Sequence, residues 1–143
     1  MYRFKSLLAD IQISDDFGLT WVPKVQKSAT DQWGQLIRGG TSGPYFASKY
    51  ASSDQFGVYR SVDGGGTWEE FTVPGGGTSE EVDFANSLAY DILTDTLYLG
   101  SGDENHVYRL QNASAVTPAS AVWEELPDPG SLPRHHNLVL IND

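Results

Sequence analysis

Two segments of the chain repeat one eight-residue pattern. The first reads Ser-Asp-Asp-Phe-Gly-Leu-Thr-Trp from Ser14 to Trp21, and the second reads Ser-Val-Asp-Gly-Gly-Gly-Thr-Trp from Ser61 to Trp68. Both follow Ser-x-Asp-x-Gly-x-Thr-Trp, and their separation is on the order of the 40 to 50 residues that repeat proteins use for one structural unit. The pattern therefore predicts a fold built from repeats.

The residue types in this pattern predict a hairpin turn that is stabilised by its own side chains. Glycine supplies the positive φ of a tight turn, and the aspartate accepts hydrogen bonds from nearby amides. The tryptophan then opens the return strand and packs against a neighbouring sheet. An aspartate here could also bind a cation and a tryptophan could bind a sugar, but two copies at one spacing favour the structural role. The turn residues are Ser14, Asp16, Gly18, Thr20 and Trp21, and Ser61, Asp63, Gly65, Thr67 and Trp68.

The pattern resembles the Asp box, also called the bacterial neuraminidase repeat, of β-propeller proteins. That repeat is found in sialidases, xyloglucan-cleaving glycosidases, sortilin-type receptors and photosystem assembly factors. The resemblance implies blades of four-stranded antiparallel sheet, with the box between the third and fourth strands. It implies little about chemistry, because these families share the repeat and differ in activity.

Short apolar or alternating runs between Gly, Pro and Asp clusters predict an all-β fold with no helix. Residues 27–33 read as polar and turn-prone. A third repeat is indicated by Val107-Tyr108-Arg109, which matches Val58-Tyr59-Arg60, although residues 111–121 replace its box. The expected strands are residues 1–6, 8–14, 20–25, 35–40, 44–50, 56–60, 67–73, 87–91, 96–100, 106–110, 122–126 and 136–141.

These strands amount to about three blades in a single domain, residues 1–143. The blades are residues 1–26 completed by 134–143, then 34–74, then 83–127. Closed propellers have about four to eight blades, so three cannot close a ring. We expect either a partial propeller whose remaining blades belong to a longer chain, or a ring completed by a homo-oligomer.

The charge and the cysteine count exclude several functions. The formal charge of −10 argues against nucleic acid and anionic membrane surfaces as partners, because both require a basic face. The absence of cysteine excludes a disulfide framework and a thiolate metal site. No run is long enough to span a membrane, and residues 1–5 do not open a signal peptide. We nevertheless expect an extracellular or cell-surface protein from the resemblance.

A possible ligand face follows from up-and-down topology, in which successive turns alternate between the two ends of a sheet. The boxes lie at one end, so the face at the other end should bind partners. This face carries acidic, aromatic and basic residues. We expect no cofactor and no metal there, because His135 and His136 have no further metal ligands at the spacing of a metal site. The candidates are Trp33, Asp54, Glu81, Asp103, Arg134 and His135, with Asp31 and Asp83 as candidate catalytic carboxylates.

The leading functional hypothesis is a non-catalytic binding or scaffold module for a protein or carbohydrate ligand. The Arg-Ile-Pro segment of sialidases is absent, and Arg60 and Arg109 occupy equivalent repeat positions beside the turn, which indicates structural roles. The alternative is a fragment of a glycoside hydrolase, xyloglucanase-like rather than sialidase-like, in which two carboxylates would flank the scissile bond. A second alternative is a self-assembling partial propeller.

Overall fold

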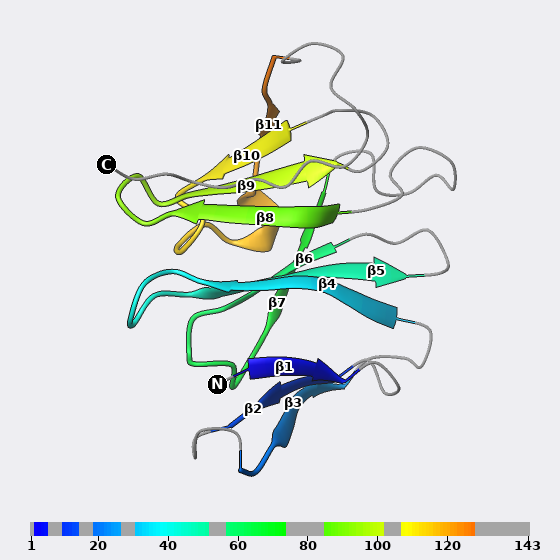
Figure 1. Ribbon diagram of the computed structural model, residues 1–143. Coiled ribbons are helices and arrows are strands. Elements are labelled where there is room, and N and C mark those ends of the chain that lie inside the picture. Colours follow the sequence, from blue (N-terminus) through cyan, green and yellow to red (C-terminus); the bar gives the residue numbers. More distant parts are fainter. Residues whose placement is uncertain are drawn as a thin grey trace.

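The computed structural model describes residues 2–5, 10–14, 19–26, 31–51, 57–73, 85–101 and 107–127. In these residues eleven strands form three antiparallel sheets, which are stacked in chain order with the second between the first and the third (Figure 1). Two sheets have four strands and the first has three. The predicted all-β architecture with four-stranded antiparallel sheets is therefore confirmed.

Each sheet consists of strands that are consecutive in the sequence. The first sheet contains β1 (Tyr2–Lys5), β2 (Asp10–Ile13) and β3 (Val22–Gln26). The second contains β4 (Asp31–Arg38), β5 (Tyr45–Ala51), β6 (Gly57–Ser61) and β7 (Glu69–Thr72). The third contains β8 (Ala85–Asp91), β9 (Thr96–Ser101), β10 (Val107–Gln111) and β11 (Trp123–Glu125). Residues 134–143, which the sequence predicts to complete the first sheet, lie outside the described residues.

The up-and-down order gives the second and third sheets two distinct ends. The connections at residues 39–44, 62–68, 92–95 and 112–122 lie at one end, which we call the box end. The opposite end, where β4 begins at Asp31 and β5 ends at Ala51, is called the loop end. Asp31 pairs with Ala51 and Arg38 pairs with Tyr45, so the length of β4 separates the two ends.

The first strands of the second and third sheets, β4 and β8, both carry a register irregularity near their beginning. The register of β4 against β5 shifts between Trp33 and Leu36, and that of β8 against β9 shifts between Ala85 and Ser87. A bulge absorbs an extra residue and lets pairing continue beyond it. The prediction that residues 27–33 are turn-prone is therefore wrong for residues 31–33, which belong to β4.

The expectation of a fold without helix is wrong at one place. In the long connection between β10 and β11, η1 (Pro118–Ser120) forms a single 3₁₀ turn. The Ser120 amide donates to the Thr117 carbonyl at 3.0 Å, and Pro118 occupies the start of the turn, where its fixed φ suits a helix. A three-residue turn has no periodicity that the sequence could reveal.

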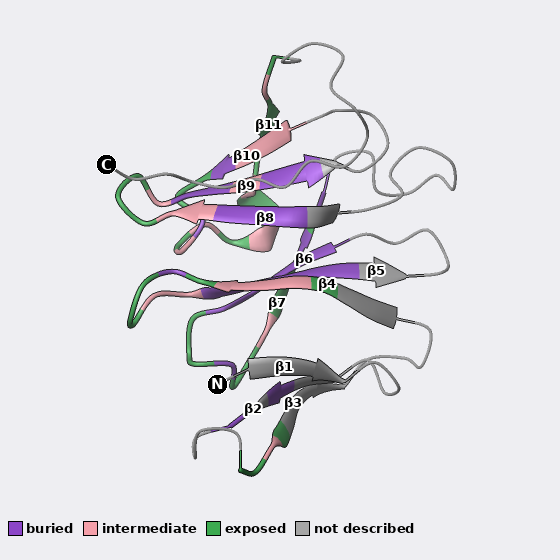
Figure 2. Cartoon of the chain, in the orientation of Figure 1, coloured by how far each residue is buried: buried purple, intermediate pink, exposed green. Residues whose placement is uncertain are grey.

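Among the described residues, the larger of two hydrophobic clusters lies between the second and third sheets. Phe46, Val58 and Phe71 of the second sheet are fully buried against a leucine-rich face of the third. That face consists of Leu88, Leu97, Leu99 and Leu110. Figure 2 shows the buried residues concentrated where β5 and β6 face β8 and β9. Alternation along each strand directs these side chains to one face, so packing of the two sheets follows from the period-two pattern.

Candidate functional site

The second box turn is held together by hydrogen bonds among its own residues. The sequence predicts that Asp63 accepts hydrogen bonds within its turn, and the Thr67 amide donates to Asp63 Oδ1 at 2.8 Å. The Thr67 hydroxyl donates to Oδ2 at 2.7 Å, and the Ser61 hydroxyl donates to Oδ1 at 2.9 Å. Ser61 Oγ in turn accepts from the Gly65 amide at 2.8 Å. Both carboxylate oxygens of Asp63 are thus engaged by the turn itself.

Backbone geometry and electrostatics agree with this arrangement. Gly64 and Gly65 have φ values of +72° and +87°, in the left-handed region that favours glycine. A Cβ on Gly66 would lie 2.9 Å from Asp63 Oδ2, so glycine there admits the carboxylate. The hydrogen bonds from Thr67, first from its amide, and from Ser61 lower the pKa of Asp63 to about 2. The carboxylate therefore remains ionised as the acceptor at the centre of the turn.

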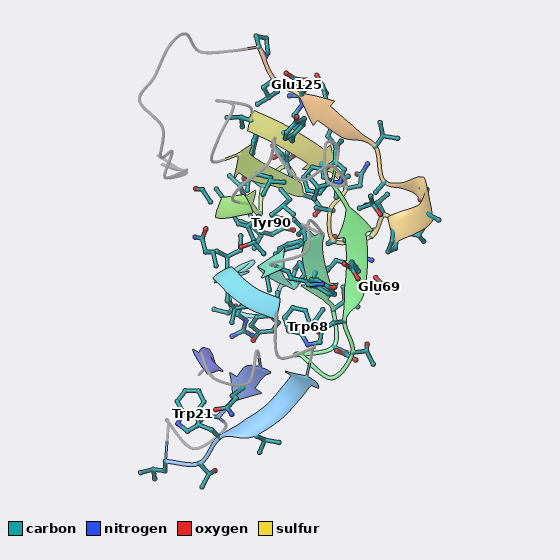
Figure 3. All side chains as sticks on the ribbon, turned by 90° about the vertical axis from the view of Figure 1, so that its right-hand side faces the viewer. Trp21, Trp68, Glu69, Tyr90 and Glu125 are labelled. Carbon is teal, nitrogen blue, oxygen red and sulfur yellow. The ribbon has the colours of Figure 1, made fainter. Side chains whose placement is uncertain are left out.

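Trp68 closes the turn from the side. Its indole Nε1 donates to the Gly65 carbonyl at 3.2 Å, and its ring packs against Ala47 and Tyr59 together with Leu36. This contact lies on the face of the second sheet that turns away from the third sheet; Figure 3 shows Trp68 there and Trp21 on the first sheet. The indole both caps a turn carbonyl and covers apolar surface.

The first box turn is only partly described. Ser14 is buried, Trp21 is half-buried and Thr20 is exposed, whereas Asp16 and Gly18 lie outside the described residues. The hydrogen bonds expected of Asp16 therefore stay a prediction.

Arg60 connects the second sheet to the third. It is 4% exposed, and its Nη1 donates to the carbonyls of Ala113 and Val116, each at 2.8 Å. Its Nη2 forms an ion pair with Glu69, the residue opposite it on β7. The guanidinium carbon also lies 4.9 Å from the centroid of the Phe71 ring, within cation–π range. These contacts use Arg60 as a structural cross-link.

Arg109 occupies the matching position in the third sheet. It lies opposite Glu124 in the register of β10 and β11, as Arg60 lies opposite Glu69. Its Nε and Nη2 donate to the two carboxylate oxygens of Glu124 at 2.9 and 3.0 Å. This bidentate hydrogen bonding, first among the causes, raises the pKa of Arg109. Its side chain is 33% exposed, in contrast to 5% for Arg60.

A second aspartate, missed by the sequence reasoning, organises the third repeat. Asp95 Oδ1 accepts from the Tyr90 hydroxyl and from the Ser114 amide, each at 2.8 Å. Its Oδ2 accepts from the Ser114 hydroxyl at 2.7 Å, and its carbonyl accepts from the Ala113 amide at 3.0 Å. Asp95 thus ties the connection after β8 to the connection after β10, which has no box of its own. Burial, followed by the hydrogen bond to Asp95, raises the pKa of Tyr90 to about 12.

The predicted ligand-face residues are only partly within the described chain. Asp31 and Trp33 lie on β4 at the loop end, opposite the box turn, and their side chains are not described. The remaining candidates lie outside the described residues, so whether the fold brings them together stays a prediction. They are Asp54, Glu81, Asp83, Asp103, Arg134 and His135.

A shallow groove of about 290 Å³ lies along the connection before β11 and is lined by residues that include Gln111, Val116 and Glu124. The carboxylate that lines this groove is that of Glu124, which already forms an ion pair with Arg109. Within the described ranges, no group of three His, Cys, Asp or Glu side chains could hold a metal ion. None of the helical segments described there is long and apolar enough to cross a membrane.

Comparison with known proteins identifies the repeat. Residues 12–23 match the family model described as BNR/Asp-box repeat. No curated protein matches the chain. A crystal structure of a protein of unknown function from Dyadobacter fermentans DSM 18053 is similar, with 20% sequence identity and a TM-score of 0.47. That likeness covers 87% of this chain and 35% of the other, so the chain spans about a third of that protein's length.

Proposed function

We propose that the three sheets are blades of an Asp-box β-propeller and that this part of the protein is a binding or scaffold module rather than a catalyst. The observation that carries the proposal is that Asp63 and Arg60 of the second sheet hydrogen-bond to other parts of the chain. Asp63 accepts only from donors of its own turn in the described contacts, and Arg60 bonds to Glu69 and to two carbonyls of the next sheet. A catalytic carboxylate or a substrate-binding arginine needs hydrogen-bonding atoms that are free to contact a ligand.

The proposed ligand face is the loop end. Asp63 and Asp95, the carboxylates described at the box end, bond to neighbouring turn residues, which supports a ligand site at the opposite end. Asp31 and Trp33 lie two positions apart at the start of β4 there, and residues of these two types suit either a sugar ring or a protein side chain. The proposed ligand is a carbohydrate or a protein, and the proposed setting is extracellular or at the cell surface.

The test compares binding and turnover on the same substrates. The purified chain is titrated with xyloglucan, β-glucan and sialyl oligosaccharides by calorimetry, and each mixture is then analysed for released sugar. Binding without release supports the proposal, and Trp33→Ala should then weaken binding. The matched control is Val62→Ala, an exposed residue of the box turn, which should bind as the unaltered chain does. Sugar release that Asp31→Asn or Asp83→Asn abolishes overturns the proposal in favour of a glycoside hydrolase.

A further inference from the structure

The second box turn contains an Asp-Gly step, a dipeptide with its own covalent chemistry. Asp63 is the one aspartate of the sequence that is followed by glycine. The amide nitrogen of a following glycine can attack the side-chain carboxyl carbon of an aspartate, because no Cβ hinders the approach. The first box has Phe17 at the position of Gly64, so the repeated pattern does not itself require glycine there. The local reason for glycine is the left-handed φ of +72° at Gly64.

The reaction at such a step rearranges the backbone without a net change in composition. A bond forms between the Gly64 nitrogen and Asp63 Cγ, and the carboxyl hydroxyl leaves with the amide proton as water, which gives a five-membered succinimide. Water then adds to one of the two ring carbonyls. Addition at the main-chain carbonyl breaks its bond to the Gly64 nitrogen and yields isoaspartate, whereas addition at Cγ restores aspartate. The reaction therefore needs no reagent other than water.

Burial does not protect this dipeptide. Asp63 and Gly64 are both exposed. Apart from its chain neighbours, no atom of the described residues lies within 4 Å of the position that a Cβ on Gly64 would occupy. Solvent water therefore has access to the site, and any protection in the folded protein must come from the hydrogen bonds of the turn.

These hydrogen bonds hold the carboxylate of Asp63 in an unreactive position and in its unreactive form. The amide and the hydroxyl of Thr67 donate to its two oxygens at 2.8 and 2.7 Å, and the Ser61 hydroxyl donates at 2.9 Å. Attack by the adjacent Gly64 requires the carboxylate to rotate out of these bonds. Ring closure also proceeds from the neutral carboxyl group, because an ionised carboxylate is a poor electrophile. The bonds, first those from Thr67, lower the pKa of Asp63 from 3.8 to about 2, which reduces the neutral fraction at neutral pH about 60-fold.

We infer that Asp63 is a site of isoaspartate formation and that the hydrogen bonds of its own turn suppress this modification in the folded protein. Opening of the turn frees the carboxylate to react with Gly64. In isoaspartate the backbone is one carbon longer and the free carboxylate is attached directly to Cα, so Thr67 and Ser61 lose the acceptor that they share. Each opening that ends in isoaspartate therefore removes the turn permanently, and the turn hydrogen bonds set the chemical lifetime of the second repeat.

The test is the rate of isoaspartate formation at residue 63 in the whole chain, incubated at neutral pH with and without guanidinium chloride. Peptide mapping with electron-transfer fragmentation locates the isoaspartate, and ¹⁸O-labelled water marks the residues that have passed through the succinimide. The unfolded chain should form isoaspartate at least about 60-fold faster than the folded chain, because it loses both the ionisation and the fixed geometry of the carboxylate. Equal rates in the two states overturn the inference, as does isoaspartate that carries no label.

Variants of the turn test the hydrogen bonds under native conditions. Thr67→Ala removes the hydroxyl donor and keeps the amide donor, so it should raise the rate in the folded chain at least about fivefold, the factor expected of one net hydrogen bond. Thr67→Ser retains a hydroxyl and should restore the slow rate. Thr72→Ala is the matched control, because it makes the same change at an exposed threonine of β7 and should leave the rate unaltered.

Circular dichroism and a thermal melt establish that each variant is folded. A folded Thr67→Ala that reacts no faster than Thr72→Ala overturns the inference. If Thr67→Ala does not fold, the comparison of the folded and unfolded states of the unaltered chain decides the question without it. No ligand enters these measurements, so their outcome is independent of the binding function proposed above.

Discussion

The Nη1 atom of Arg60 and the backbone carbonyl of Ala113 lie 2.8 Å apart although 53 positions separate the two residues in the sequence. This hydrogen bond crosses from the strand before the second box to the connection that replaces the box in the third repeat. It couples the residue just before one box turn to the connection between the last two strands of the next sheet. A repeat of this kind is therefore stabilised both within each unit and between units.

Replacing Arg60 with alanine should destabilise the fold strongly. The substitution leaves the carbonyls of buried Ala113 and half-buried Val116 without the Arg60 donor and removes the packing on Phe71, so we expect a loss of about 3–5 kcal/mol. Arg60→Lys keeps the charge but loses the planar guanidinium group. Its cost in stability should lie between zero and that of Arg60→Ala. Denaturant unfolding measures both, with exposed Arg38→Ala as the control that should cost under about 1 kcal/mol. A cost for Arg60→Ala no larger than that of Arg38→Ala would contradict the cross-link.

The two roles of Trp68 can be separated by two substitutions. Trp68→Ala removes the ring from Ala47, Tyr59 and Leu36 and should cost about 3 kcal/mol, at the lower end of the range for aromatic truncation because the ring is half-buried. Trp68→Phe keeps most of the packing and loses the hydrogen bond to Gly65, so it should cost about 1 kcal/mol. Chemical denaturation of both variants provides the comparison. Equal costs for the two would mean that packing is not the larger contribution.

Because of Asp63, the free energy of unfolding should depend on pH in the acid range. Its pKa is about 2 in the folded protein against 3.8 ordinarily, so the unfolded chain binds the proton more readily. The stabilisation is therefore complete above pH 3.8 and is lost as the pH falls through about 2. Asp63→Asn should lower the melting temperature at neutral pH, and the difference from the unaltered protein should shrink between pH 4 and 2. A difference that stays constant over this window would contradict the turn hydrogen bonds.

The sequence could predict those features that depend on neighbouring residues. Ser61, Asp63 and Thr67 are close enough in the chain that their types alone indicate the turn, and the alternation around Leu97 and Leu99 indicates which face is buried. A family model matches the pattern at residues 12–23 for the same reason, since the signal is short and local.

The features that the sequence did not predict depend on distant contacts. Residues 31–33 look like a loop because they are polar, yet a bulge continues β4 through them, and Gln35 at that bulge accepts from the Leu88 amide at 2.5 Å. Asp95 resembles any polar turn residue, and its role depends on Ser114, which is 19 positions away. Neither contact leaves a periodic pattern in the sequence. The roles of all the loop-end candidates, Asp31 and Trp33 included, remain predictions.

Tyr90 should make the protein sensitive to alkali. Its pKa is raised from 10.0 to about 12 in the folded state, so the unfolded chain releases the proton first. The associated stabilisation is complete below pH 10 and is lost as the pH rises through about 12. Tyr90→Phe should cost about 1 kcal/mol at neutral pH, through loss of the hydrogen bond to Asp95, and this deficit should diminish between pH 10 and 12.

The same tyrosine reports on Asp95 directly. The difference in tyrosinate absorbance between the unaltered protein and Tyr90→Phe isolates Tyr90 from the six other tyrosines of the seven in the chain. Asp95→Asn removes the negative charge beside the hydroxyl and should lower the pKa of Tyr90, while burial, the larger cause, keeps it above 10.0. Asp91→Asn is the matched control, because Asp91 is the smallest of the causes and its removal should change the titration least. If Asp95→Asn and Asp91→Asn moved the titration equally, Asp95 would not be the aspartate that holds the two connections together.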